Sequence, residues 1–491
     1  MQLIDKDLLS VQEVRELVER SKAAQHKLAQ MDQRQVDRIV ASITEAGVRN
    51  AKRLAVMANQ ETGFGLVEDK TIKNIFASKG VYDRIKDLKT VGVISRDEEA
   101  KSMDVAVPVG IIAALIPSTN PTSTVLYKAI ISIKAGNSVI FSPHPNAKDC
   151  IAETVKVVRQ AIAEADGPED LVLGISLPTI QATEALMHHS DTSLILATGG
   201  SAMVRAAYAS GTPAIGVGPG NSPAYIERTA DLKMAVKRIL DSKTFDNGTI
   251  CASEQSVITE RDMAEAVQAE MERQGAYFLS DEEAVKLGKF ILRPNGTMNP
   301  MIVGKSVQTI ADLAGLSIPQ SARVIVARET GVGMKHPYSN EKLAPILGFY
   351  VEDDYEKVCD RCREILFFEG AGHTFSIHTQ NPEMVEYFAT RIPVSRFLVN
   401  TPAALGGVGA TTSLMPSYTL GCGAIGGSST SENVGPMNLL NIRKVVYGIR
   451  ELDEIRRDVG AATPAGVSAV AVSPDMVDDI VKKIMARLQA M

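Results

Sequence analysis

The amino-acid sequence predicts an α/β protein with a doubly wound parallel sheet and a second α/β unit after it. From residue 107 onward, short apolar runs of strand length alternate with amphipathic helices. This alternation is typical of a parallel sheet that helices cover on both faces. The same rhythm resumes after Cys251, and a chain of 491 residues is long enough for two or three domains.

The first 107 residues predict helices followed by a β-hairpin. Residues 8–90 carry apolar side chains at helical spacing, for example Val36, Ile39, Val40 and Ile43. Residues 90–95 and 103–107 predict two strands joined by a charged turn. A two-stranded hairpin is not stable alone, so we expect this one to pack on another domain or another subunit.

The doubly wound sheet is expected to have five strands. They are predicted at 110–116, 138–142, 171–176, 193–198 and 213–217, with helices between them at 125–135, 149–165, 179–188 and 203–210. Ligands of such sheets bind beyond the carboxyl ends of the strands. Small residues and glycines stand there, so we expect ligand contacts at Pro117, at Gly218 and along the run Thr198, Gly199, Gly200 and Ser201.

The run Thr198–Ser201 follows a strand and opens a helix. A phosphate group could bind at that helix N-terminus. A plain tight turn without a ligand fits the same pattern, and no G-x-G-x-x-G fingerprint occurs in this region.

The second α/β unit is expected to continue to about residue 430. Helices are predicted at 261–273, 281–290, 355–367 and 382–389, and strands at 323–327, 346–351, 374–378 and 396–400. A glycine-rich stretch covers 406–427, and 440–448 predicts a last strand. Residues 459–472 have the composition of a flexible linker, and 473–491 predict a terminal helix.

Composition and charge exclude several classes of protein. The net charge is −6, which argues against a nucleic-acid binder. The richest apolar run, residues 105–117, is too short to cross a membrane. The start of the chain has no signal-peptide pattern, and the five cysteines are an odd, thinly spread number, so we expect a reducing cytoplasm.

Cys251 lies on a predicted turn between a helix at 232–243 and a strand at 255–259. The preceding run Asp246-Asn247-Gly248 favours tight or left-handed backbone. A thiol on such a turn, with backbone N–H groups nearby, suits a nucleophile that attacks a carbonyl. The alternative is an ordinary buried thiol, because free cysteine is among the most buried residue types.

The other cysteines and histidines give weaker signals. Cys359 and Cys362 have CxxC spacing, but they lie on an amphipathic helix without a partner pair, so packing is favoured over a metal or redox role. Cys150 and Cys422 are expected to be structural, and no metal site is predicted. His373 stands in a glycine turn before a strand, either as a site residue or as a packed or solvent histidine.

Several long stretches resemble the coenzyme A-acylating branch of the aldehyde dehydrogenase superfamily, above all the aldehyde dehydrogenase half of bifunctional alcohol/aldehyde dehydrogenases. They are residues 116–124 (IPSTNPTST), 140–145 (IFSPHP), 185–189 (ALMHH), 194–200 (LILATGG), 243–257 (KTFDNGTICASEQSV), 341–345 (EKLAP) and 431–436 (SENVGP). The resemblance implies a nucleotide-binding domain at 1–235 with an oligomerisation hairpin at 90–107, and a catalytic domain at 236–430. It also implies a return segment at 431–458.

The resemblance implies roles for matching residues. Cys251 falls at the family's nucleophile, and Asn120 falls at the amide that holds the oxyanion together with the cysteine N–H. Glu341 falls where the family binds the nicotinamide ribose, and Thr198–Ser201 where it approaches the dinucleotide. The implied cofactor is NAD, preferred to NADP. Coenzyme A is the implied co-substrate, a homo-oligomer is expected, and His373 could assist the acyl transfer.

One departure from the hydrolytic branch is informative. Hydrolytic members carry a general-base glutamate before a Gly-Gly pair, whereas residues 215–221 here read IGVGPGN and contain no carboxylate. Without that base, water should attack a thioester slowly, while the thiol of coenzyme A needs less help. Acetaldehyde is the first choice of substrate, with propionaldehyde or sulfoacetaldehyde as alternatives. The rival readings are a hydrolytic aldehyde dehydrogenase that releases the acid and a catalytically idle scaffold protein.

The terminal helix at 473–491 carries a single apolar stripe. The stripe consists of Met476, Val477, Ile480, Val481, Ile484, Met485 and Leu488. Its arrangement after a linker resembles the encapsulation peptides of bacterial microcompartments, which implies a shell protein as partner and the microcompartment lumen as location. The alternative is a helix that packs back on its own subunit or oligomer.

Overall fold

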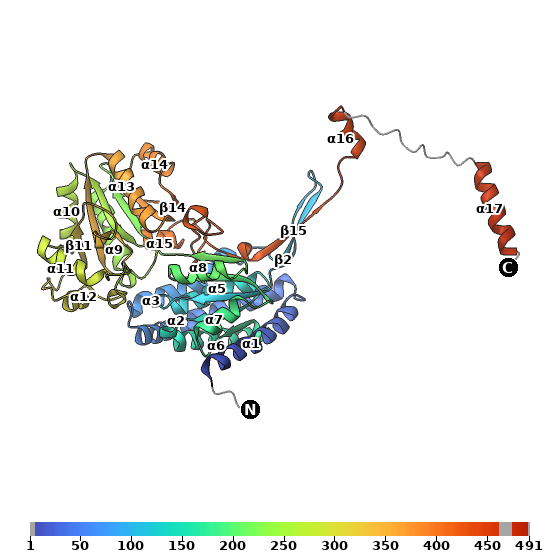
Figure 1. Cartoon of the computed structure of the whole chain (residues 1–491), viewed down its shortest axis with the longest axis horizontal. Helices are drawn as coiled ribbons and strands as arrows, with labels where there is room; N and C mark the ends of the chain where they lie inside the picture. Colours follow the sequence, from blue (N-terminus) through green and yellow to red (C-terminus); the bar gives the residue numbers. More distant parts are fainter. Residues whose placement is uncertain (1–4, 461–473, 490–491) are drawn as a thin grey trace. The chain divides into compact units, whose positions relative to one another are not determined.

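The computed structural model of the chain describes residues 5–460 and 474–489. The chain divides into two units, Met1–Gly92 with Ala106–Ile442 and Val93–Val105 with Arg443–Met491, and each is described by itself. Within the first unit, the blue-to-green lobe of Figure 1 holds a five-stranded sheet and the yellow-green-to-orange lobe holds a seven-stranded sheet.

The five-stranded sheet confirms the predicted doubly wound arrangement. Its strands have the order β5-β4-β3-β6-β7 and are all parallel. They are β3 (Ile111–Ile116), β4 (Ser138–Pro143), β5 (Val172–Gly174), β6 (Thr192–Thr198) and β7 (Ala214–Val217). The strand order reverses between β3 and β6, which is where ligands of such sheets bind.

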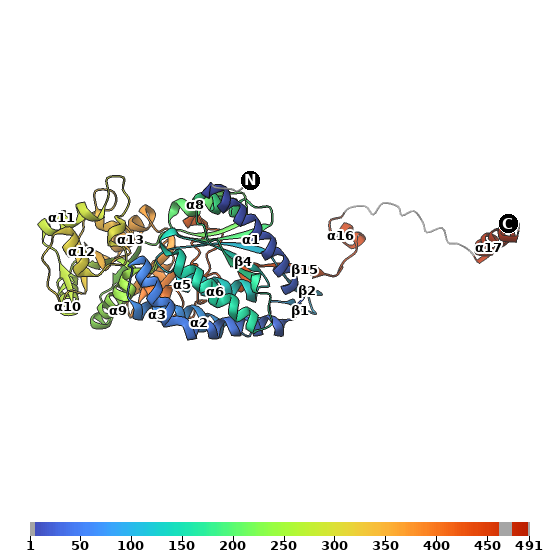
Figure 2. The same cartoon turned by 90° about the horizontal axis from the view of Figure 1, so that it is seen from below.

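Helices cover both faces of this sheet (Figure 2). The helices of this lobe are α1 (Lys6–Leu28), α2 (Gln33–Thr62), α3 (Val67–Ile75), α4 (Val81–Ile85), α5 (Pro121–Lys134), α6 (Lys148–Glu164), α7 (Ile180–Met187) and α8 (Ser201–Ala209). Alternate residues of β3 enter two different cores: Ile112, Ala114 and Ile116 pack with α2, α5 and α6. Ile111, Ala113 and Leu115 pack with α1, α7 and α8. A strand buried on both faces therefore appears in the sequence as one continuous apolar run.

Helix α5 begins at Pro121, earlier than the start at 125 that the sequence predicts. Asn120 is its N-cap residue and proline suits the first helical position. Every residue of α5 is buried, the polar ones included, so its first turn shows no amphipathic pattern. This start places Asn120 directly at the carboxyl end of the sheet.

The seven-stranded sheet is also parallel, in the order β10-β11-β12-β9-β8-β13-β14. Its strands are β8 (Ser222–Ile226), β9 (Glu254–Glu260), β10 (Ala276–Phe278), β11 (Val324–Arg328), β12 (Ile346–Glu352), β13 (Gly372–His378) and β14 (Val394–Val399). The sequence analysis did not predict β8, which contains a proline, or β10, which is very short. The chain enters this sheet at Ser222, ahead of the boundary at residue 235 that we expected.

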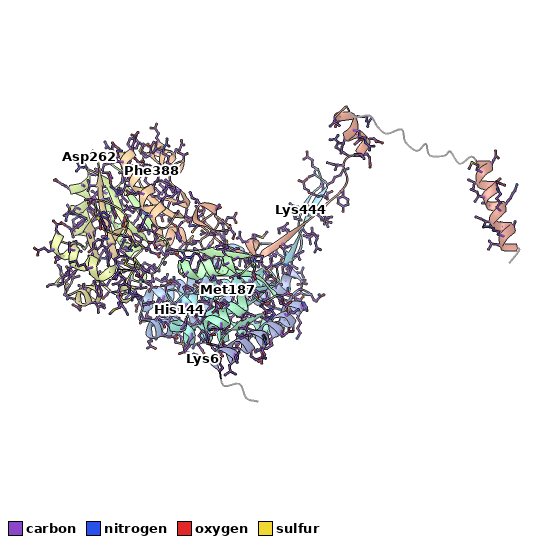
Figure 3. The ribbon with its side chains drawn as sticks, in the orientation of Figure 1. Lys6, His144, Met187, Asp262, Phe388 and Lys444 are labelled. Atoms are coloured by element: carbon purple, nitrogen blue, oxygen red, sulfur yellow. The ribbon has the colours of Figure 1, made fainter. Side chains whose placement is uncertain are left out.

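The helices of this lobe agree with the predicted ranges apart from α12 and α15, which the sequence analysis did not predict. They are α9 (Leu232–Thr244), α10 (Ala264–Arg273), α11 (Asp281–Ile291), α12 (Val307–Ala314), α13 (Tyr355–Phe368), α14 (Pro382–Ala389) and the short α15 (Ala403–Gly407). In Figure 3, Asp262 and Phe388 mark this lobe, while His144 and Met187 mark the other.

The second unit contains the expected hairpin strands. β1 (Gly92–Asp97), β2 (Ser102–Pro108) and β15 (Leu440–Val446) form a three-stranded sheet in the order β1-β2-β15. α16 (Leu452–Asp458) was not predicted, whereas α17 (Pro474–Gln489) confirms the terminal helix. Residues 461–472 of the expected linker lie outside the described residues. Across residues 5–460 and 474–489, no helix has the length and apolar character needed to cross a membrane.

Candidate active site

The turn that carries Cys251 has the backbone that its sequence predicts. After α9, Asp246, Asn247 and Gly248 are all left-handed, with φ of 48°, 51° and 76°. These residue types tolerate that conformation better than others do. The buried Asp246 carboxylate ties the turn to the first lobe, because it accepts from the Leu66 N–H at 2.7 Å and from the Lys70 ammonium at 3.0 Å. The turn is therefore a fixed platform for the residues that follow it.

A cavity of about 250 Å³ opens in front of Cys251. One side consists of the carboxyl ends of β3 and β6 and the residues after them. The other side consists of segments at the amino ends of strands in the seven-stranded sheet, with Cys251 before β9 and Glu341 before β12. Val408, Tyr418 and Leu420 close the remaining wall. The site thus forms where two sheets meet, at the strand-order reversal of the first.

Cys251 and Glu341 both line this cavity, and burial shifts the pKa of each. Burial, with a contribution from the Glu341 charge, raises the pKa of the Cys251 thiol to about 12. Burial, together with the neighbouring Glu369, raises the pKa of Glu341 to about 8. One Glu341 oxygen, Oε1, accepts a hydrogen bond from the Gly220 N–H at 3.0 Å. With a pKa of about 12, the Cys251 thiol is protonated at neutral pH.

The side-chain amide of Asn120 is oriented by bonds on both of its ends. Its Oδ1 accepts from the Lys73 ammonium at 2.6 Å, and its Nδ2 donates to the Thr249 carbonyl at 3.0 Å. The remaining Nδ2 hydrogen has only a longer contact, 3.3 Å, to Thr119 Oγ1. Asn120 lines the same cavity as Cys251, and its long bond to Thr119 Oγ1 is the one that an oxyanion in the cavity would replace.

This geometry agrees with what sequence comparison finds. Residues 4–358 match the sequence profile of the aldehyde dehydrogenase family. The chain belongs to the aldehyde dehydrogenase family. It is 45% identical over 441 residues to the bifunctional aldehyde-alcohol dehydrogenase AdhE of Escherichia coli strain K12, covering 89% of this chain and 49% of the relative. The chain thus spans about half the length of that relative.

A second relative is matched along nearly its whole length. The acetylating succinate-semialdehyde dehydrogenase of Clostridium kluyveri is 39% identical over 438 residues, which cover 89% of this chain and 96% of the relative. The resemblance to acylating members of the aldehyde dehydrogenase family that the motifs indicate is confirmed.

Solved structures of aldehyde dehydrogenases have the same fold. A probable aldehyde dehydrogenase from Listeria monocytogenes EGD-e superposes with a TM-score of 0.91 at 62% identity, covering 92% of this chain and 100% of that one. An acetylating aldehyde dehydrogenase from Geobacillus thermoglucosidasius gives 0.90 at 50% identity, with 92% and 99% covered. A propionaldehyde dehydrogenase from a fucose-utilisation bacterial microcompartment of Clostridium phytofermentans gives 0.81 at 27%, with 88% and 97% covered.

The structure brings most of the predicted aldehyde dehydrogenase site residues into one cavity. Those that line it are Pro117, Asn120, Thr198, Gly199, Gly200, Gly218, Cys251 and Glu341. Ser201 is the first residue of α8 but does not line the cavity.

His373 lies behind the cavity rather than in its lining. Its ring is fully buried, Nδ1 is 2.9 Å from Thr374 Oγ1, and Nε2 has no hydrogen-bond partner among the described residues. Burial, and then the Arg396 charge, lower the pKa of His373 well below its usual value. The Gly220 backbone adjoins the ring, because a Cβ added at Gly220 would lie 3.1 Å from His373 Cε1.

The cavity has features that fit a dinucleotide. Helix α8 has no side-chain cap at its N-terminus, so its first N–H groups are available to an anion. A Cβ added at Gly200 or Gly218 would meet nothing within 4 Å, so open space adjoins the backbone at both glycines. Backbone N–H groups beside open space suit the phosphates of a nucleotide.

Sequence reasoning missed several residues around the site. Lys70 and Lys73 of α3 are buried, although lysines on a helix are usually exposed to solvent. His144 lines the cavity after β4, and burial lowers its pKa. Its position after a parallel strand was the one available signal.

The remaining cysteines are packed, as the sequence predicts. Cys150, Cys359, Cys362 and Cys422 are all buried and free. In the part of the chain that the structure describes, no group of three or more histidine, cysteine, aspartate or glutamate side chains is placed to hold a metal ion.

Proposed function

We propose that this aldehyde dehydrogenase oxidises a short-chain aldehyde to its acyl-coenzyme A, with NAD as hydride acceptor. The observation that carries the proposal is that Cys251 and the oriented amide of Asn120 share one small cavity, while the segment 215–221 beside it contains no carboxylate. The first pair suits thioester formation. The missing base favours a thiol over water as the acceptor of the acyl group.

The chain's own residues would act in a defined order. The Cys251 thiol first releases its proton to solvent, because its raised pKa keeps it protonated before the reaction. The resulting thiolate attacks the aldehyde carbon, and the carbonyl oxygen becomes an oxyanion that accepts from Asn120 Nδ2 and the Cys251 N–H. NAD⁺, when bound, supplies the acceptor for the hydride that leaves this carbon. The acyl group remains on Cys251 as a thioester. The thiolate of coenzyme A then attacks the same carbon, and Cys251 leaves as a thiolate.

Hydrolysis is the second candidate, and Glu341 is the observation that favours it. Glu341 is the one carboxylate among the described residues that line the cavity, and its pKa of about 8 is suitable for a general base. Against this role, Glu341 Oε1 already accepts the Gly220 N–H. The resemblance gives Glu341 the nicotinamide ribose instead.

The dependence of turnover on coenzyme A distinguishes the acylating reaction from hydrolysis. The full-length protein is mixed with acetaldehyde and NAD⁺, and NADH and acetate are measured with and without coenzyme A. The acylating reaction predicts slow steady-state turnover without coenzyme A, a strong increase on its addition, and acetyl-coenzyme A as product. Rapid acetate release without coenzyme A that is lost in Glu341→Gln would establish hydrolysis instead.

The cavity lining supports acetaldehyde or propionaldehyde over an anionic aldehyde. Ile250, Leu343, Val408 and Leu420 are apolar, and no lysine or arginine is among the described lining residues. A sulfonate or a second carboxylate would have no cation to pair with there. We therefore expect kcat/KM for acetaldehyde to exceed that for sulfoacetaldehyde by at least tenfold in an aldehyde panel.

A homo-oligomer is proposed from the second unit. β1 and β15 are mostly exposed, and several large apolar side chains near β15 and α16 lie in solvent. They are Val446, Tyr447, Ile449, Leu452, Ile455 and Val459. Exposed apolar patches of this kind mark protein interfaces. Sedimentation of the chain, with Ile449→Glu as the disrupting variant, tests the proposal: a wild-type monomer would contradict it.

We further propose that the tail directs the enzyme into a microcompartment in the cytoplasm. Ile480, Ile484 and Leu488 of α17 are half or more exposed and share one face of the helix. The C. phytofermentans neighbour comes from a microcompartment. A fluorescent protein fused to residues 460–491 should co-purify with shells, and truncation after Gly460 should leave solution kinetics unchanged. A diffuse fusion beside intact shells, or an inactive truncation, would contradict the proposal.

A further inference from the structure

A buried ionic cluster lies next to the Asn120 amide. It consists of Lys70 and Lys73 from α3 and Asp246 from the turn before Cys251. Lys70 is 3% exposed, Lys73 2% and Asp246 0%. The cluster extends to Asp69, whose carboxylate accepts the Asp246 N–H at 2.7 Å. Burying charges is unfavourable unless hydrogen bonds satisfy them, so the arrangement of this cluster needs a reason.

Lys73 has a complete set of hydrogen-bond acceptors. Its ammonium donates to Asn120 Oδ1 at 2.6 Å, to Thr249 Oγ1 at 3.0 Å and to Asp246 Oδ2. Thr249 Oγ1 in turn donates to Asp246 Oδ2 at 2.8 Å. An ammonium has three N–H donors, so all of them are used here. The chain atoms therefore fix both the position and the direction of this charge.

The bond to Asn120 determines what Asn120 presents to the cavity. An ammonium against Oδ1 excludes the flipped amide, in which the NH₂ group would face a cation. It also withdraws electron density from the amide, which strengthens its N–H donors. We propose that Lys73 is a positioning residue: it holds and polarises the Asn120 amide so that Nδ2 stabilises the oxyanion on the aldehyde. The inference rests on the proposed oxyanion role of Asn120.

Lys70 provides a matched control within the same cluster. It lies one helical turn earlier, has the same charge and almost the same burial, and donates to the same Asp246 Oδ2. Its second bond goes to the Thr119 carbonyl at 3.1 Å, and it makes no hydrogen bond to Asn120. Lys70→Met and Lys73→Met therefore remove equal charge from one carboxylate, but only Lys73→Met releases the amide.

The experiment compares Lys73→Met, Lys70→Met, Asn120→Ala and the double variant Lys73→Met/Asn120→Ala in the full-length protein. The readouts are kcat for NADH formation with acetaldehyde and coenzyme A, and KM for NAD⁺. Lys73→Met should lower kcat by about 10- to 100-fold with KM for NAD⁺ unchanged, because a hydrogen bond to a charged group is lost. Lys70→Met should lower kcat by less than about threefold, because Asp246 keeps its bonds to Lys73, Thr249 Oγ1 and the Leu66 N–H, and Asn120 keeps its bond to Lys73.

The double variant separates positioning from general structural damage. If Lys73 acts through Asn120, adding Lys73→Met to Asn120→Ala should cost less than about threefold, because no amide remains to be held. Equal losses in the two backgrounds, or equal losses for Lys70→Met and Lys73→Met, would overturn the inference while leaving the oxyanion role of Asn120 intact. An unchanged kcat in Asn120→Ala would overturn that role and the inference together.

A second variant addresses folding. If Lys73→Met does not fold, Lys73→Met/Asp246→Asn keeps the net charge of the cluster, and asparagine tolerates the left-handed backbone at residue 246. This pair should fold and show the same loss of kcat. Wild-type kcat in the folded pair would overturn the inference.

Discussion

Gly220→Ala should lower kcat strongly, because the added Cβ would clash with the Cys251 carbonyl group. A Cβ built on Gly220 lies 2.0 Å from the Cys251 carbonyl oxygen and 2.9 Å from its carbonyl carbon. A carbon and an oxygen that are not bonded need roughly 3 Å or more, so either the loop at Gly220 or the Cys251 backbone has to move by about 1 Å. A displacement of about 1 Å at a reacting group costs about a hundredfold in rate. We therefore expect kcat to fall by about a hundredfold, although neither the added Cβ nor the Cys251 carbonyl oxygen takes part in the proposed reaction.

The assay is NADH formation with acetaldehyde and coenzyme A, with thermal unfolding measured in parallel. Gly174→Ala is the control, because a Cβ there makes only ordinary contacts, 3.5 Å or longer, and lies in β5 away from the cavity. The control should keep wild-type kcat. A Gly220→Ala variant that folds and retains more than about a third of wild-type kcat would refute the claim that this close approach fixes the nucleophile.

Other predictions follow from the same geometry. Cys251→Ala should abolish NADH formation and keep the fold, and turnover by this variant would contradict the mechanism. Cys359→Ala and Cys362→Ala should keep kcat but lower the free energy of unfolding by about 1 kcal/mol each, because both thiols are buried in α13. Glu341→Gln should lower the pKa of Cys251, because the Glu341 charge raises it. Since the pKa of Glu341 is about 8, iodoacetamide should alkylate both proteins at similar rates at pH 7, and the variant should react faster only above pH 8; an equal gain at every pH would exclude this electrostatic cause.

The sequence alone determined most of the elements and the turn that carries the proposed nucleophile. Alternating apolar runs fix which residues are buried, so both sheets and nearly all of their helices followed from periodicity. The run Asp246-Asn247-Gly248 predicts a turn from local sequence alone, and the positive φ of all three residues confirms the turn. Cys251 was recognisable for the same reason, since its exposure depends on the turn that carries it.

Only the tertiary structure decided which residues face one another. β8 joins the second sheet although its own sequence gives a weak strand signal, because its partners β9 and β13 come later in the chain. From the sequence, Lys73 would be expected to be exposed to solvent, whereas in the folded chain it is buried in an ion pair with Asp246. His373 was a candidate for the cavity because of its glycine turn, and the structure buries it beside Gly220, outside the cavity lining. Periodicity reports whether a side chain is buried, but its partners lie on distant segments and are chosen by packing.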